Sequence, residues 1–145
     1  TETNLGGTLQ AIRALAPGMV ARRRGHIVNI GSIMGLYPMS AAIYGATKGG
    51  IHMLGSTLRL ELQGSGVRIS EVSPGRVQSE FFAANLKDPA GAEALNSAFK
   101  LLLPEDVAQA VVFVLEAPAH VNVSMVELCA VEQIPGGVQI APLEG

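Results

Sequence analysis

The chain alternates between two kinds of segment, and this alternation limits the folds that it can adopt. Residues 8–23 and 43–63 repeat apolar side chains every three or four positions, as amphipathic helices do, and Gly25 is placed to close the first of them. Residues 26–30 and 67–72 are short β-branched runs, which suit strands buried on both faces of a parallel sheet. The order helix, strand, helix, strand therefore predicts an α/β fold with crossover helices.

The second half of the chain continues the pattern after an interruption. Residues 78–103, rich in Ala, Phe and Leu, predict a small helical excursion. Pro104 begins another helix, which runs through Leu115, because proline suits the first helical turn. Residues 121–131 predict a last strand. Pro17 lies inside the first helix, where we expect it to kink or interrupt the helical pattern.

Composition argues against several classes of function. A formal charge of -2, 4% aromatic residues and no Trp do not supply the basic field or the stacking surfaces of nucleic-acid binding. Cys129 is the chain's single cysteine, so no intramolecular disulfide can form, which fits a reducing, cytoplasmic location. No apolar run approaches the roughly 20 residues that span a bilayer. His26, His52 and His120 lack metal-ligand spacing, so we expect no metal site.

Tyr44 and Lys48 are the pair of residues that most directly points to chemistry. They lie four positions apart in the second helix, so the phenol and the ammonium share one helix face. A tyrosine with an ordinary pKa near 10 is a poor acid or base at neutral pH. A neighbouring ammonium lowers that pKa towards the working pH, as general acid–base catalysis requires. The alternative is a tyrosine at a helix start beside a surface lysine.

Two loops at the ends of strands carry further candidates. Ser32 follows the strand at 26–30, where a hydroxyl at the carboxyl end of a parallel strand can donate a hydrogen bond to a substrate carbonyl oxygen. Pro74 and Gly75 break the next strand in a rigid turn with free backbone N–H groups, and such a turn can hold a flat, amide-bearing ring such as nicotinamide. The alternatives are an ordinary Ser-rich loop and an ordinary Pro–Gly turn.

Four motifs occur in a fixed order along the chain: Asn4–Gly7, Gly31–Ser32, Tyr44–Lys48 and Pro74–Ser79. They resemble the successive signatures of the classical short-chain dehydrogenases, and the resemblance covers essentially the whole chain. It implies the C-terminal, catalytic part of a doubly wound Rossmann-type parallel sheet. It also implies that residues 1–145 are one portion of a single domain, incomplete at the N-terminus.

The resemblance implies a role for each of the matching side chains. Tyr44 would be the general acid in carbonyl reduction and the general base in alcohol oxidation. Lys48 would lower the pKa of Tyr44 and hold the nicotinamide ribose hydroxyls. Ser32 would orient and polarise the substrate carbonyl, and Asn4 would support a water-linked proton relay behind Lys48.

The resemblance also implies a site for a nicotinamide cofactor, either NAD or NADP. Backbone groups of Pro74, Gly75 and Val77, together with the hydroxyl of Ser79, would hold the nicotinamide carboxamide. The family usually has Thr where Ser79 stands, and this difference keeps the hydroxyl. Tyr44 and Lys48 would complete the cofactor contacts.

A finer resemblance concerns the substrate. Residues 104–108 and 120–123, with Leu36–Pro38, look like the branch that contains 3-hydroxy acid and serine dehydrogenases that prefer NADP. In that branch the interval from the serine to the tyrosine is usually one residue longer than the interval from Ser32 to Tyr44. The substrate therefore stays open, and a 3-oxoacyl or ketone reductase is the alternative within enzymes.

One expected motif is missing, namely the Gly-rich dinucleotide turn that follows the first strand of such folds. The resemblance therefore implies that the half binding adenosine and pyrophosphate is absent, that a hydrophobic sheet edge is exposed, and that the chain alone is inactive. The alternative is a non-catalytic oligomerisation module or inactive homologue. Family members commonly pair the helix that contains Tyr44 between subunits, so we expect a homodimer or homotetramer with a small-molecule substrate.

Overall fold

A parallel sheet forms the centre of the computed structural model, which describes residues 2–78, 90 and 100–135. Its three strands lie in the order β1-β2-β3, and each neighbouring pair is parallel. The strands are β1 (Gly25–Ile30), β2 (Val67–Pro74) and β3 (Met125–Leu128). The structure therefore confirms the predicted α/β fold, with sequential strands adjacent in one parallel sheet.

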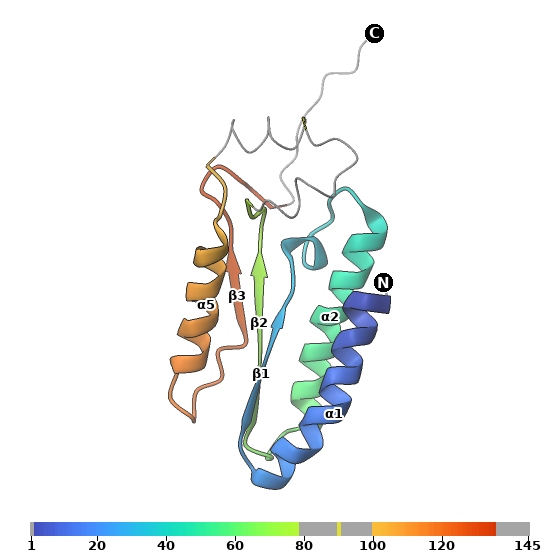
Figure 1. The fold of residues 1–145 in the computed structure, drawn as a ribbon, viewed down its shortest axis with the longest axis vertical. Helices are drawn as coiled ribbons and strands as arrows, with labels where there is room; N and C mark the ends of the chain where they lie inside the picture. Colours follow the sequence, from blue (N-terminus) through green and yellow to red (C-terminus); the bar gives the residue numbers. More distant parts are fainter. Residues whose placement is uncertain (1, 79–89, 91–99, 136–145) are drawn as a thin grey trace.

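Helices cover both faces of this sheet, and Figure 1 shows the arrangement. The long helices α1 (Gly7–Arg22) and α2 (Ala42–Glu61) lie on one face, and α5 (Pro104–Glu116) lies on the other. A π-helical turn, η1 (Glu2–Gly6), leads into α1, and a short 3-10 turn, η2 (Ile33–Gly35), follows β1. Among the helices of the described ranges, none has the length and apolar character needed to cross a membrane.

The pleat of β2 sends alternate side chains to opposite helices. A Cβ added to Gly55 of α2 would contact Ile69, so Ile69 faces α2. Arg68, the preceding residue, instead donates hydrogen bonds to carbonyl groups just beyond the end of α5. Because side chains alternate along a strand, Glu71 and Ser73 share the α2 side with Ile69.

Two details of the first helix differ from the sequence prediction. Pro17 does not interrupt α1, which continues through it to Arg22. Pro17 and Arg13, four residues earlier, are both exposed, so the carbonyl that proline leaves without a helical partner can be hydrated. Gly25 does not close α1 either: Arg23 is the C-cap in the left-handed region (φ 54°), and Gly25 already begins β1.

The last strand is shorter than predicted, because a side chain replaces the first part of its ladder. The side-chain amide of Asn122 accepts a hydrogen bond from the N–H of Ile69 (3.0 Å) and donates one to the Ile69 carbonyl (2.9 Å). Regular pairing with β2 therefore starts only at Met125. The helical excursion predicted for residues 78–103 lies almost entirely outside the described residues.

The edge of the sheet at β1 is the side nearest the predicted site. Among the described residues, β1 pairs with β2 alone, and Ile30 at its carboxyl end is 45% exposed. Residues of η1, α1, β1 and α2 line a cleft of about 410 Å³ beside this edge. The cleft and the carboxyl end of β1 therefore meet close to Lys48, which is one of the lining residues.

Candidate active site

Tyr44 and Lys48 occupy successive turns near the start of α2, as their spacing predicts. The ammonium nitrogen of Lys48 lies 5.8 Å from the centre of the Tyr44 ring. Tyr44 is 37% exposed, whereas Lys48 is half-buried. The phenol and the ammonium therefore share one site on one face of the helix.

Lys48 connects the helix to the end of strand β1. Its Nζ donates a long hydrogen bond of 3.4 Å to the carbonyl of Ile30, the last residue of the strand. Burial lowers the pKa of Lys48 below its usual value, and the negative charge of Glu71 opposes this effect. An ammonium has three N–H donors, so one contact to Ile30 leaves donors for hydroxyl groups of a ligand.

Ser32 lies in the loop between β1 and α2 and is only 8% exposed. Its Oγ accepts a hydrogen bond from the N–H of Met34 (3.1 Å) and thereby caps the η2 turn. A Cβ on Gly35 would lie 2.6 Å from the carbonyl carbon of Lys48, so only glycine permits the close approach of this loop to α2. The loop that carries Ser32 is thus packed directly on the turn that carries Lys48.

Asn4 lies in the π-helical turn η1 at an exposed position. It lines the same cleft as Lys48, although the two residues are 44 positions apart in the sequence. The carbonyl of Asn4 accepts a hydrogen bond from the hydroxyl of Thr8 (2.7 Å), which holds this turn to the start of α1. The fold therefore brings Asn4 and Lys48 to one cleft.

The Pro–Gly turn after β2 differs from the sequence prediction in one respect. The N–H of Gly75 donates to the carbonyl of Leu128 (2.8 Å), and the N–H of Arg76 donates to Oε1 of Gln133 (2.8 Å). The expectation of free N–H groups at this turn is therefore wrong for these two residues. The chain beyond β3 returns beside the turn and satisfies them, a long-range contact that the local sequence does not reveal.

The rest of the predicted carboxamide site is only partly described. Pro74 is the last residue of β2 and is buried. Val77 forms an isolated parallel bridge with Leu102, which fixes the chain just beyond the turn. Ser79 lies outside the described residues. Its role as a hydroxyl contact to nicotinamide stays a prediction.

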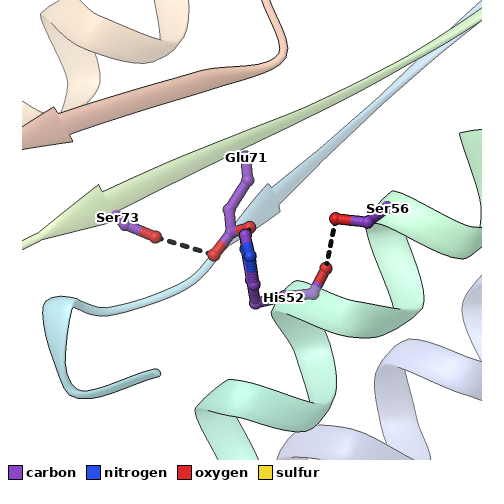
Figure 2. Close-up of polar contacts among 4 residues, drawn as sticks. All are labelled: His52, Ser56, Glu71 and Ser73. Carbon is purple, nitrogen blue, oxygen red and sulfur yellow. Dashed lines mark hydrogen bonds and ion pairs between the residues drawn. The ribbon is translucent and has the colours of Figure 1, made fainter. Parts of the chain in front are cut away.

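Sequence reasoning gave no role to two titratable residues near Lys48, namely Glu71 and His52. Glu71 is only 6% exposed, although carboxylates are rarely so deeply buried. Its Oε2 lies 2.6 Å from Nδ1 of His52, and its Oε1 accepts a hydrogen bond from Ser73 (2.7 Å); Figure 2 shows the carboxylate between them. The available signal was a glutamate in the middle of a strand predicted to be buried on both faces, because a buried charge needs a partner.

The histidines do not gather into a metal site. His52 contacts Glu71, and His26 on the other side of the sheet forms a hydrogen bond with Ser70 (2.8 Å). Within the part of the chain that the structure describes, no group of three or more His, Cys, Asp or Glu side chains is arranged to hold a metal ion.

The family of the chain follows from its sequence match as well as from this geometry. The model of the short chain dehydrogenase family matches residues 1–90, which is more than half of the 145 residues. The chain therefore belongs to the short-chain dehydrogenase family, as its four motifs predict.

Individual relatives narrow the comparison. An NADP-dependent 3-hydroxy acid dehydrogenase of Salmonella typhi is 40% identical over 144 residues, which cover 96% of this chain and 57% of that protein. The protein of the same description from Escherichia coli K12 is 39% identical over 142 residues, again with 96% and 57% coverage. The chain therefore spans a little over half the length of these curated relatives.

Solved structures give the same picture of a partial fold. The closed form of a serine dehydrogenase complexed with NADP+ superposes with a TM-score of 0.86 at 36% identity, covering 97% of this chain and 58% of that one. A 3-oxoacyl-[acyl-carrier protein] reductase from Brucella melitensis is similar with a TM-score of 0.71 at 31% identity, covering 95% of this chain and 51% of that one. The chain thus forms part of a Rossmann-type fold.

Proposed function

We propose that the protein containing this chain is an NADP-dependent oxidoreductase that transfers a hydride between the cofactor and a small hydroxyl- or carbonyl-bearing substrate. The observation that carries the proposal is the placement of Tyr44 and Lys48 on one helix face at the carboxyl end of β1. The family match and the NADP-dependent relatives support it.

In this proposal the side chains handle the proton, and the bound nicotinamide supplies or accepts the hydride at the substrate carbon. During carbonyl reduction, the hydroxyl of Tyr44 gives its proton to the substrate oxygen, and in alcohol oxidation the phenolate takes that proton back. The Ser32 hydroxyl donates a hydrogen bond to the same oxygen as charge develops on it. The positive charge of Lys48 stabilises the phenolate, and Asn4 supports the water-linked path by which the proton is replaced.

The described residues fit a nicotinamide ribose beside Lys48. Among the described residues, the ammonium forms one long hydrogen bond, to Ile30, and it lines a cleft, so it can bind ribose hydroxyls. We assign the carboxamide end of the cofactor to Pro74, Gly75, Val77 and the Ser79 hydroxyl. Because Gln133 accepts the hydrogen bond of Arg76 in this structure, its side chain would have to yield if the carboxamide used that N–H.

For the substrate we propose a small 3-hydroxy acid, following the names of the most similar relatives. The matched 3-oxoacyl reductase structure keeps an acyl carbonyl substrate as the alternative. The two classes differ in charge and size, because a free 3-hydroxy acid carries a carboxylate and an acyl thioester does not. Turnover with each class therefore distinguishes them.

We also propose that residues 1–145 are the catalytic portion of one dehydrogenase domain and do not turn over substrate alone. The coverage of the relatives supports this proposal. The proposed assembly is a homodimer or homotetramer paired through α2, where Ile43, Met53 and Leu60 are 77%, 62% and 73% exposed. A cytoplasmic location is consistent with the single Cys129.

The test is a cofactor titration with two proteins, the 145-residue chain and the product of the complete gene that contains it. Nicotinamide fluorescence is followed as NADPH or NADH is added, and NADP+ reduction is then measured with 3-hydroxy acids and with 3-hydroxyacyl thioesters. We expect saturable NADPH binding and 3-hydroxy acid turnover by the complete product, and neither by the 145-residue chain. A complete product that binds no cofactor would contradict the proposal and favour a non-catalytic module.

A further inference from the structure

A buried carboxylate lies behind the acid–base pair, and the proposed function leaves it without a role. Glu71 sits in the middle of β2 with its side chain on the α2 face of the sheet, only 6% exposed. A charged side chain at such a depth costs several kcal/mol unless other groups compensate it. A carboxylate buried this deeply needs compensating partners, and its position near Lys48 suggests a role in the acid–base site.

The partners hold the carboxylate in one orientation. The Ser73 hydroxyl donates to Oε1 at 2.7 Å, and Nδ1 of His52 lies 2.6 Å from Oε2. Because a carboxylate only accepts hydrogen bonds, Nδ1 of His52 carries the hydrogen in this contact. The carbonyl of His52 in turn accepts a hydrogen bond from Ser56 one helical turn later, as Figure 2 shows. Both oxygens of Glu71 are thus engaged, and its side chain is fixed.

The fixed carboxylate and Lys48 converge on the same short stretch of backbone. A Cβ added to Gly31 would collide with Oε1 of Glu71 and would lie 2.6 Å from the Ser73 hydroxyl. The Nζ of Lys48 donates to the carbonyl of Ile30, the residue immediately before Gly31. Glu71 and Lys48 therefore approach the end of β1 together, and His52 is one turn beyond Lys48 on the same helix.

The groups around Lys48 come from five elements. Asn4 of η1, Thr8 of α1 and Asn29 of β1 line the cleft beside it and are neutral. On its own helix, Tyr44 and His52 are titratable, and on β2 the titratable group is Glu71. Among these described neighbours, Glu71 is the one carboxyl group, and it is not part of the proposed chemistry.

We propose that Glu71, held in place by Ser73 and His52, is a positioning residue that keeps Lys48 in its ammonium form. This inference rests on the proposed function, since it assigns Glu71 a role in the same acid–base site. Glu71 thereby influences the pH range over which Lys48 can act as an ammonium in this site.

The physical argument concerns two opposing effects on one ammonium. Burial lowers the pKa of Lys48, because the charged form loses hydration, and the negative charge of Glu71 raises it. If Glu71 were neutral, burial alone would act. Removing the negative charge of Glu71 should therefore lower the pH at which Lys48 loses its proton. A neutral Lys48 no longer stabilises the phenolate that Tyr44 becomes when it gives up its proton, so carbonyl reduction should slow.

The experiment separates charge from shape with two substitutions in the complete gene product. Glu71→Gln keeps the size of the side chain and removes its charge, whereas Glu71→Asp keeps the charge and shortens the side chain. Glu61→Gln, the same change at an exposed position near the end of α2, is the matched control. If Glu71→Gln does not fold, Ser73→Ala replaces it, since that variant removes only one hydrogen bond to the carboxylate.

Two readouts are used, and the first needs neither cofactor nor turnover. Competitive acetylation followed by mass spectrometry gives the pH midpoint at which Lys48 becomes a reactive neutral amine. We expect this midpoint to fall by about one pH unit in Glu71→Gln, by a smaller amount in Ser73→Ala, and to change little in Glu71→Asp and Glu61→Gln. The second readout is kcat/KM for carbonyl reduction, whose alkaline limb should move to lower pH by a similar amount in Glu71→Gln.

Two contrary outcomes are distinguishable. If Glu71→Gln lowers the free energy of unfolding but leaves both the Lys48 midpoint and the alkaline limb unchanged, Glu71 is merely structural and the inference is overturned. If the acetylation midpoint falls as expected while the wild-type protein shows no turnover, the proposed function fails and the electrostatic link between Glu71 and Lys48 stands.

Discussion

The two faces of strand β2 both bury polar side chains, but different kinds of group satisfy them. On the α5 face, Arg68 donates hydrogen bonds from one guanidinium nitrogen to the carbonyls of Ala117, Pro118 and Val121, at 3.0 to 3.2 Å. On the α2 face, Glu71 is held by two side chains, of which one is titratable. Main-chain carbonyls do not titrate, so the contacts of Arg68 stay the same with pH, whereas the contacts of Glu71 include the titratable side chain of His52.

Within this one strand, the contacts of Arg68 serve the fold, whereas the contacts of Glu71 lie next to the proposed acid–base site. The contacts of Arg68 tie β2 to the connection between α5 and β3, far in sequence from the four motifs of the family. The contacts of Glu71 reach the helix that carries Tyr44 and Lys48. A substitution of Arg68 should therefore cost stability and leave the pH profile of activity unchanged, whereas a substitution of Glu71 should move that profile.

The largest effect is expected from Tyr44→Phe in the complete gene product. Removing the hydroxyl deletes the proposed proton donor, so kcat should fall about 10²- to 10⁴-fold. Because Tyr44 is 37% exposed, the free energy of unfolding should change by less than about 0.5 kcal/mol. Steady-state kinetics and urea unfolding measure the two quantities. Tyr37→Phe is the matched control, and an equal loss of kcat there would contradict the assignment.

Arg68→Met tests the α5 face of the comparison. It removes the donor for three carbonyls that are partly buried, so the free energy of unfolding should fall by about 2 kcal/mol. The kcat of the folded protein should stay close to wild type, because Arg68 faces away from α2. Urea denaturation and kinetics check both statements, with Arg13→Met at an exposed position of α1 as the control. A shifted pH profile of kcat in Arg68→Met would contradict the proposed difference between the contacts of Arg68 and those of Glu71.

Asp106→Ala probes the start of the helix that covers the α5 face. The carboxylate of Asp106 accepts a hydrogen bond from the N–H of Leu103 (2.7 Å) and lies at the positive end of the α5 dipole. Its loss should lower the free energy of unfolding by about 1 kcal/mol. Glu105→Ala removes a charge from the same first turn, and we expect a smaller cost there. Equal costs would show that the dipole, and not the hydrogen bond, provides the stabilisation.

The smallest expected effect is a pH dependence of stability that comes from His26. Burial, and to a lesser extent the charge of Arg68, lower the pKa of His26 below 6.5 in the folded protein. The unfolded chain therefore takes up a proton near pH 6.5 that the folded chain resists, so stability is complete above that pH and declines as the pH falls to the folded value. After solvent screening, the decline should amount to a few tenths of a kcal/mol.

The measurement compares unfolding at pH 7.5 and about pH 5.5 for the wild type, His26→Asn and the exposed His120→Asn. Part of the decline should disappear in His26→Asn and persist in His120→Asn. A decline that is identical in all three proteins would mean that other groups dominate the pH dependence.

Much of the fold followed from local patterns along the chain. The periods of three to four predicted α1 and α2, and Pro104 predicted the start of α5. The short β-branched, alternating or apolar runs predicted the three described strands, because burial leaves a regular pattern in sequence. The spacing of Tyr44 and Lys48 was equally informative, since residues four apart on a helix must share a face. Those signals need only the geometry of a single element.

Tertiary structure decided what depends on contacts between distant segments. The late start of β3 depends on the Asn122 side chain reaching Ile69, and the occupied N–H of Arg76 depends on Gln133. The pairing of Glu71 with His52 likewise joins a strand to a helix. Such contacts depend on how elements pack, and packing leaves no regular period in the sequence. The chain by itself therefore determined its elements and its acid–base pair, and only the folded molecule placed a carboxylate behind that pair.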